Sequence, residues 1–424
     1  MKVAAILVAM ILLALPNRAI AQAIVDVSPT TTSFSTPDLQ HSVSGRILSL
    51  AVSADPTARL YAGTYAGVWR SDDAGLTWRQ LTRPQPPQGV NTVPGALMVP
   101  NVYDLVVSPV NRDLVFAATI GDTRVQPKDG IYRSADGGNT WSLVHQFGCS
   151  GGGPVGQVVF APDNPNLLFA AGGCAIGIST DSGLTWMDQE ITGTVWHIAV
   201  APQEDFIRRV YAAGDGQIWY SQDGGQTWFR DNAPLPNTAG GRAGDCCGNN
   251  AHVLVVEPGH PDHVYLAVPG LANGRSYYHP TSLGLDGQPA NTPPDNPLRP
   301  AGEGSVWLGD YSGFVVGDPN RQVATWMQLS GPPLYYWGST DSGNVYLEAK
   351  VTPSGYLLFF SDRAHVHVSL GRPTPTSWHR LDGRNVSQGR LDGCFGNDNN
   401  GSQGCNQLFV HVDPHALAVS SDFN

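Results

Sequence analysis

The apolar residues of this chain are grouped in short runs, and the runs come in pairs separated by a few polar residues. The first run of a pair reaches a proline, and the second run follows soon afterwards. The pairs lie at 105–109 with 114–118, 158–162 with 167–171, 198–202 with 210–213, and 253–258 with 264–268. Such runs are typical of strands that are buried on both faces. Beyond its first residues the chain has no amphipathic run of helical period, so the pattern predicts an all-β protein.

An eight-residue phrase, Ser-x-Asp-x-Gly-x-Thr-Trp, occurs four times, at 71–78, 134–141, 179–186 and 221–228. We call these copies the turn segments. Asp and Ser side chains stabilise tight turns by bonding to the backbone, and Gly accepts a positive φ, so each copy is expected at the tip of a β-hairpin. The closing Trp is large enough to pack between neighbouring units. Four copies in one chain predict a repeat architecture.

The phrase resembles the Asp-box, or BNR repeat, of sialidases, sortilin-type receptors, xyloglucan-cleaving endoglucanases and photosystem assembly factors. In those families it joins the third and fourth strands of a propeller blade, on the outer rim and away from the central site. The resemblance implies an all-β propeller of about seven four-stranded blades in which these residues are structural. The residues in question are Ser71, Asp73, Gly75, Trp78, Ser134, Asp136, Gly138, Trp141, Ser179, Asp181, Gly183, Trp186, Ser221, Asp223, Gly225 and Trp228. A catalytic or metal-binding role for the four aspartates is the alternative, and the turn role already explains them.

The last blade is expected to be incomplete within this sequence. A single propeller domain spans 22–424, with an insertion rich in Pro, Gly and Asn at 271–302. The final unit begins at Leu408, and the sequence ends at Asn424. Either the segment 24–45 supplies the missing strands, or the chain is a truncated piece of a longer protein, because an open blade would leave unpaired edges.

The N-terminus predicts export. Lys2 precedes an apolar stretch at 3–15, and the small residues at 19–21 fit a cleavage site, so residues 1–21 are interpreted as a secretory signal peptide. The protein is therefore expected to be secreted or periplasmic. The apolar stretch is short for a membrane span, and no second one follows. The formal net charge of −11, without any basic run, argues against a nucleic-acid partner.

Six cysteines fit an oxidising compartment. Local disulfides between Cys149 and Cys174 and between Cys394 and Cys405 are favoured. The adjacent Cys246 and Cys247 form either a strained vicinal bridge or bonds elsewhere. A zinc site is the rival interpretation, but no Cys-x-x-Cys pair accompanies a spaced His pair. We assign no metal or cofactor, although oxygen ligands at 397–401 or the His-x-Asp-x-His spacing at 411–415 would suit calcium or another divalent cation.

The start of each innermost strand of a propeller faces the central channel. Counting back from the proline of each pair gives a polar residue at this position in strand after strand. The residues are Asp104, Gln157, His197 and Glu348, each five residues before a proline, His252, six residues before Pro258, and His415, five residues before Ser420. Burying a polar group without a partner is costly, so this recurrence needs an explanation.

Two interpretations of these polar residues remain open. In the first, they bond to water or backbone and tie the inner strands together. In the second, Asp104 and Glu348 are the two carboxyl groups that glycoside cleavage requires, and His197, His252, His415 and Gln157 hold the ligand.

The resemblance favours a protein that recognises a glycan or polysaccharide and acts as a glycoside hydrolase. The sialidase branch fits poorly, because its Arg-Ile-Pro phrase is missing and no cluster of three arginines can be identified. The alternative is a non-catalytic propeller that binds a glycan or a protein partner, as sortilin-type domains do.

Overall fold

The computed structural model describes a β-protein in fifteen segments of the chain. They are residues 47–54, 59–64, 67–81, 97, 101–119, 129–148, 155–214, 217–231, 253–268, 305–315, 318, 322–329, 346–361, 366–374 and 377–380. These residues form 23 strands and no helix, which confirms the all-β prediction. Accordingly, they contain no helix with the length and apolar character needed to cross a membrane.

The strands form six antiparallel sheets, each following the chain in order from the inside to the outside. The first three sheets are β1 (Ile47–Val52), β2 (Leu60–Thr64), β3 (Gly67–Ser71) and β4 (Arg79–Gln80); β5 (Val102–Val107), β6 (Val115–Thr119), β7 (Ile131–Ser134) and β8 (Ser142–His145); and β9 (Gln157–Ala161), β10 (Asn164–Ser179) and β11 (Met187–Val195). The last three are β12 (His197–Val200), β13 (Val210–Gly214), β14 (Gln217–Ser221) and β15 (Phe229–Arg230); β16 (Val253–Glu257), β17 (His260–Val268), β18 (Ser305–Asp310) and β19 (Thr325–Leu329); and β20 (Tyr346–Thr352), β21 (Gly355–Ser361), β22 (Val366–Leu370) and β23 (Trp378–Arg380).

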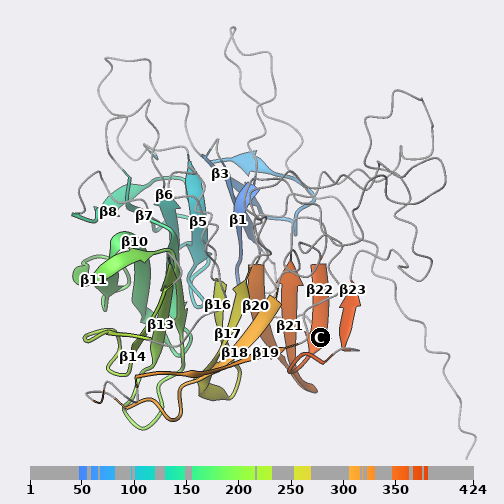
Figure 1. The fold of residues 1–424 in the computed structure, drawn as a ribbon. Helices are drawn as coiled ribbons and strands as arrows, with labels where there is room; N and C mark the ends of the chain where they lie inside the picture. Colours follow the sequence, from blue (N-terminus) through green and yellow to red (C-terminus); the bar gives the residue numbers. More distant parts are fainter. Residues whose placement is uncertain are drawn as a thin grey trace, which may run out of the picture.

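The sheets are the blades of a β-propeller. Contacts between first strands run from β1 to β5, β9, β12, β16 and β20 in turn. Figure 1 shows β1, β5, β16 and β20 in the middle of the molecule and the outer strands β8, β11 and β23 at its edges. The described residues thus form six blades rather than the expected seven. The last unit, predicted from Leu408 onward, lies outside the described residues.

The third sheet has three strands where four were expected, because β10 contains a turn. Its first half pairs with β9 and its second half with β11, and Gly173 between them has a φ of 61°. The amide of Ser182, just after the end of β10, donates to the carbonyl of Asn166 near its start at 3.0 Å, so the chain returns to the beginning of β10. This sheet therefore follows the same plan as its neighbours.

The core consists of apolar layers between neighbouring sheets. One layer packs Phe116 and Ile131 of the second sheet against Val158 and Leu168 of the third. Equivalent layers join the first sheet to the second, the third to the fourth, the fourth to the fifth and the fifth to the sixth. The second strands, such as β2, β6 and β13, bury both faces between such layers, which is the reason for the uninterrupted apolar runs in the sequence.

All four turn segments join the third and fourth strands of a blade and form one repeated hydrogen-bond pattern. In the second, Ser134 Oγ donates to Asp136 Oδ1 at 2.8 Å and accepts the Gly138 amide at 2.8 Å. Thr140 donates its amide and its hydroxyl to the two carboxylate oxygens at 2.8 and 2.6 Å. The other three copies make the same bonds.

The closing tryptophans are buried or half-buried rather than exposed to solvent. Trp78, Trp186 and Trp228 donate their indole N–H to the carbonyl of the glycine three residues earlier, at 3.1, 3.2 and 2.9 Å. The hairpin geometry predicted from the sequence is therefore present at each copy. Both carboxylate oxygens of each aspartate accept hydrogen bonds within the turn, which supports the structural role predicted for these residues.

Candidate site in the central cavity

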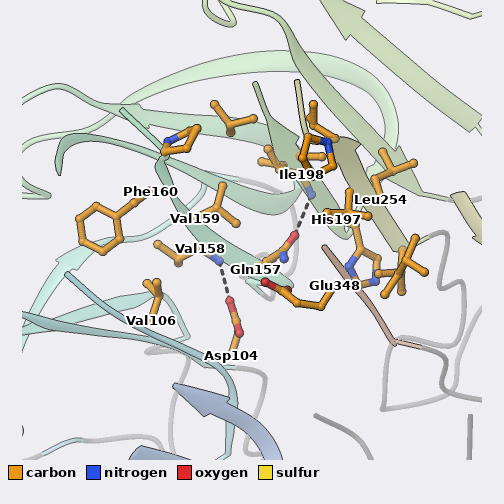
Figure 2. A pocket seen from close by; sticks show the side chains of 18 of the residues that line it. Asp104, Val106, Gln157, Val158, Val159, Phe160, His197, Ile198, Leu254 and Glu348 are labelled. Carbon is orange, nitrogen blue, oxygen red and sulfur yellow. Dashed lines mark hydrogen bonds between the residues drawn. The ribbon is translucent and has the colours of Figure 1, made fainter. Parts of the chain in front are cut away.

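A cavity of about 580 Å³ lies where the six first strands meet, and residues from every one of them line it. This size is typical of small-ligand sites. Of the proposed site residues, Asp104, Gln157, His197 and Glu348 are described, and all four line the cavity (Figure 2). The predicted ligand residues His252 and His415 lie outside the described residues.

These side chains occupy one repeated position, five residues before the proline of their run. In β5 and β12 it lies three residues before the residue that pairs with the start of the second strand, as Asp104 lies before Val107 and His197 before Val200. In β9 and β20 the second strand starts earlier, and Gln157 and Glu348 pair with Ala171 and Phe359. In β16 the residue five positions before the proline is Val253, which lines the cavity.

Sequence reasoning missed one member of the ring. Ser49 of β1 lies three residues before Val52, which pairs with Leu60, so it occupies the repeated position in the first sheet. It lines the cavity, and its buried hydroxyl has no hydrogen-bond partner among the described residues. No proline ends β1, so the count that located the other residues had no reference point here.

Two ring members tie neighbouring blades together. Asp104 Oδ2 accepts the Val158 amide at 2.9 Å, and Gln157 Oε1 accepts the Ile198 amide at 2.7 Å (Figure 2). In each case the donor is the residue that follows the ring position of the next first strand. These bonds match the structural interpretation of the ring, in which polar side chains satisfy inner-strand backbone groups.

The two carboxyl groups proposed as catalytic both titrate near neutrality. Burial raises the pKa of Asp104 to about 7, against the lowering effect of the backbone amides of Val158 and Leu105. Burial also raises the pKa of Glu348 to about 7, with Lys350 lowering it. Neither carboxyl group contributes to the pKa shift of the other. They share a cavity, and no direct pairing joins them.

Glu348 differs from Asp104 in its bonding, because no hydrogen bond to its carboxylate is found within the described part of the chain. Accepted amide bonds favour the ionised form of a carboxyl group. The two groups thus differ in their bonding, while burial raises the pKa of each to about 7.

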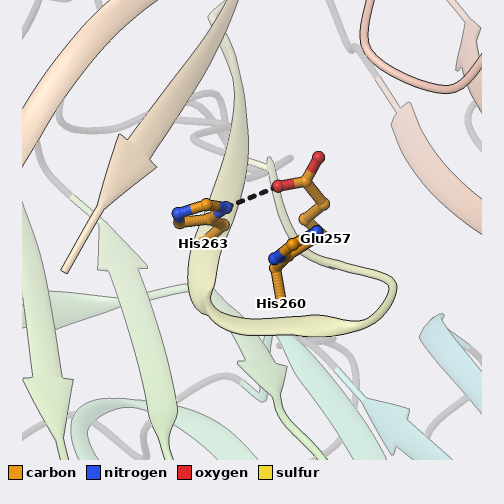
Figure 3. A group of neighbouring side chains, drawn as sticks. All are labelled: Glu257, His260 and His263. Carbon is orange, nitrogen blue, oxygen red and sulfur yellow. Dashed lines mark hydrogen bonds and ion pairs between the residues drawn. The ribbon is translucent and has the colours of Figure 1, made fainter. Parts of the chain in front are cut away.

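A second cluster lies where β16 turns into β17. Glu257, His260 and His263 place ligand atoms within 4.8 Å of one another, an arrangement that can hold a metal ion (Figure 3). However, Arg372 donates Nε and Nη2 to the two Glu257 oxygens at 2.6 and 2.7 Å. Its guanidinium already supplies the positive charge that a cation would bring.

The Glu257 carboxylate has further partners. The hydroxyls of Tyr265 and Tyr356 each donate to Oε1 at 2.7 Å, and His263 Nδ1 lies 2.7 Å from Oε2. Burial raises the pKa of this carboxyl group, and bonds from Arg372 and the two tyrosines outweigh it, so that the pKa falls to about 2. The cluster is a saturated ion-pair network between the fifth and sixth blades, and we assign no metal to it.

Of the predicted disulfides, only one half-cystine is described. Cys174 is disulfide-bonded, and its expected partner Cys149 lies outside the described residues. The remaining cysteines, the signal peptide, the insertion at 271–302 and both proposed cation sites also lie outside them. Those assignments stay predictions.

The similarity of this chain to known proteins is partial. No family model matches it. A protein described as "Xyloglucanase" from a Paenibacillus species is 30% identical over 233 residues, which are 45% of this chain and 21% of that protein. The chain thus spans about a fifth of the length of the curated relative that it matches.

Similar solved structures include an ancestral GH74 enzyme and a complex of YCF48 with a D1 peptide. The first has 17% identity and a TM-score of 0.48, with 77% of this chain and 36% of that one covered. The second has 15% identity and a TM-score of 0.44, with coverages of 79% and 81%.

Proposed function

We propose that this propeller recognises a xyloglucan-like polysaccharide in its central cavity and cleaves it as a glycoside hydrolase. The observation that carries the proposal is the single cavity into which Asp104 and Glu348 both project, each with a pKa of about 7. The 30% identity to a protein described as a xyloglucanase supports the substrate class. Gln157 and His197 line the same space and offer hydrogen bonds to sugar hydroxyls.

The bonding of the two carboxyl groups assigns their roles. Protonated Glu348 gives its proton to the leaving glycosidic oxygen as the bond from that oxygen to the anomeric carbon breaks. Ionised Asp104, stabilised by the Val158 amide, takes a proton from the water that attacks the anomeric carbon. Enzymes commonly raise the pKa of a carboxylic acid for this purpose by burying it.

Export and family membership belong to the same proposal. The four turn segments form the hydrogen-bonded turns that their resemblance to Asp-boxes implies, which supports a place among the Asp-box propellers. The predicted signal peptide at 1–21 would deliver the protein outside the cytoplasm, where such polysaccharides are found.

The test compares hydrolysis of xyloglucan and a panel of other polysaccharides by the full chain and three variants. Glu348→Gln and Asp104→Asn should each lower kcat by about 10²-fold or more, the usual contribution of an acid or base. The matched control is Glu190→Gln, which alters an exposed carboxylate on β11 away from the cavity. An activity that survives both cavity substitutions would remove this site assignment.

A non-catalytic polysaccharide-binding propeller is the second candidate, favoured by the backbone bonds of Asp104 and Gln157. In that case retardation in a xyloglucan-containing gel would persist without any release of reducing sugar. Glu348→Gln would then change the retardation only modestly, whereas hydrolysis would be absent from the unmodified chain as well.

A further inference from the structure

The turn between β12 and β13 has an unusual backbone. Glu204 and Ile207 exchange both backbone hydrogen bonds, at 2.9 and 2.7 Å, and enclose only Asp205 and Phe206. These two residues have φ values of 46° and 68°. Two-residue hairpins of this kind are usually built from Asn-Gly or Asp-Gly, because both central residues need a positive φ. Phenylalanine is a bulky side chain in the place where glycine is preferred.

The Phe206 side chain does not pack against the rest of the protein, so no burial of apolar surface offsets this strain. Its side chain is 98% exposed, the highest value among the exposed large apolar residues. It therefore exposes apolar surface and also occupies a disfavoured conformation. Phe206 is therefore unfavourable in this turn on both counts, and glycine would fit the turn better.

The turn is held rigidly at its base. Arg208 donates Nη1 and Nη2 to the two oxygens of Asp163 at 2.6 and 3.0 Å, and the Gln203 amide donates to Asp163 at 3.0 Å. Arg208 Nη1 also donates to the Ala201 carbonyl at 3.0 Å. These bonds hold the backbone at the base of the turn, so ordering of the backbone adds little to the entropic cost of binding at its tip.

The turn borders the end of the cavity opposite the ring of polar residues. Pro202 and Glu204 line this end together with Pro162 and His260. Val351, at the end of β20, adds a side chain that is 65% exposed. Glu204 thus connects the turn to an end of the cavity that is lined in part by apolar side chains.

The charge around the turn is negative. Arg208 and Arg209 are neutralised by Asp163 and Asp262. Glu204 and Asp205 are exposed, and their carboxylates form no ion pair within the described part of the chain. An exposed aromatic face next to two unpaired carboxylates suits a lysine or arginine side chain, which can lie over the ring and pair with a carboxylate.

We propose that the turn at 204–207 is a docking site for a basic, partly apolar segment of another protein, anchored by Phe206. This site is separate from the polar end of the cavity, and the proposal does not depend on the glycoside hydrolase function.

The test measures binding of a short fluorescein-labelled peptide of alternating Lys and Leu to the full chain, by fluorescence anisotropy. Phe206→Gly should lower the affinity for the peptide by about tenfold or more, which is the effect of removing an interface anchor. The same variant should unfold at a higher urea concentration, because it relieves the strained φ. The matched control is Met187→Ser, which removes an exposed apolar side chain on β11 and should change the affinity by less than about twofold.

Two further measurements make the outcome decisive. The double variant Glu204→Gln with Asp205→Asn should lower the affinity for the peptide and make that affinity less dependent on salt concentration. A peptide with Glu in place of Lys should not bind to the unmodified chain. The proposal would be overturned if Phe206→Gly and the unmodified chain bound the Lys-Leu peptide with equal affinity. It would also be overturned if Phe206→Gly abolished self-association or vesicle binding while leaving peptide binding unchanged, since the tip would then serve a second copy or a lipid surface.

Discussion

The turn segments make a sharp prediction about blade packing, which can be tested at Gly183. This residue has a φ of 76°, and a Cβ placed on it would lie 2.2 Å from Cε1 and 2.5 Å from Cζ of Phe116. Phe116 belongs to the preceding blade, is fully buried and packs edge-on against Phe160. Its ring has no room to move away, so the glycine is needed where the turn of one blade meets the sheet of the next.

The cost of Gly183→Ala follows from two separate effects. Placing alanine in the left-handed region costs about 1 kcal/mol. Forcing a methyl group into a packed aromatic layer costs typically about 1–3 kcal/mol more. We therefore expect the free energy of unfolding to fall by about 2–4 kcal/mol, measured by urea unfolding with tryptophan fluorescence.

Gly224→Ala is the matched control, since Gly224 also has a positive φ, of 72°. A Cβ there would come no closer than 3.9 Å to a heavy atom, and the first turn segment already carries Ala74 at the equivalent position. This variant should lose only about 1 kcal/mol. Equal losses for Gly183→Ala and Gly224→Ala would refute the packing argument and leave backbone strain as the whole effect.

A double substitution isolates the contact itself. Phe116→Leu removes the ring atoms that the new methyl group would meet, so adding it to Gly183→Ala should be less harmful than the two single losses combined. A coupling free energy of at least about 1 kcal/mol is expected for residues in direct contact.

Three further predictions concern carboxyl groups. The Thr185 hydroxyl and amide lower the pKa of Asp181 to about 2, so the stability that this turn contributes is present above about pH 4 and is lost as the pH falls toward 2. In Asp181→Asn the midpoint of urea unfolding should therefore change less with pH between about 4 and 2 than in the unmodified chain. Glu257→Gln leaves the half-exposed Arg372 without its partner and should cost about 2–3 kcal/mol of unfolding free energy in the same assay. Burial raises the pKa of Glu348 to about 7, so stability is lost as the pH rises from about 4.5 to 7, and Glu348→Gln should remove this loss in urea titrations at several pH values.

The sequence was most informative where a local pattern determines local structure. The bonds among Ser134, Asp136, Gly138 and Thr140 lie within one short segment, so their spacing alone predicts the turn. The apolar pairs likewise predict two adjacent strands, as at 105–109 and 114–118, because both runs must be buried between neighbouring sheets.

Features that depend on distant partners were not predictable. Nothing in the local sequence distinguishes Glu257 from other polar residues at the end of a strand. Its partners Tyr356 and Arg372 come from the next blade, about a hundred positions along the chain. The ring residue Ser49 escaped notice because its strand lacks the proline used as a marker. The blade count depends on residues beyond 380, which the structure does not describe.

The ring of polar residues explains how one fold position can serve both stability and chemistry. Asp104 and Gln157 each accept an amide from the next first strand, so a polar side chain at this position secures the blade beside it. Glu348 occupies the same position and lines the same cavity, yet no such bond holds it within the described residues. A position that recurs for structural reasons thus supplies a protonatable group to a ligand cavity wherever the backbone bond is not made. The proposed hydrolase function therefore depends on the contrast between Asp104 and Glu348 rather than on the ring as a whole.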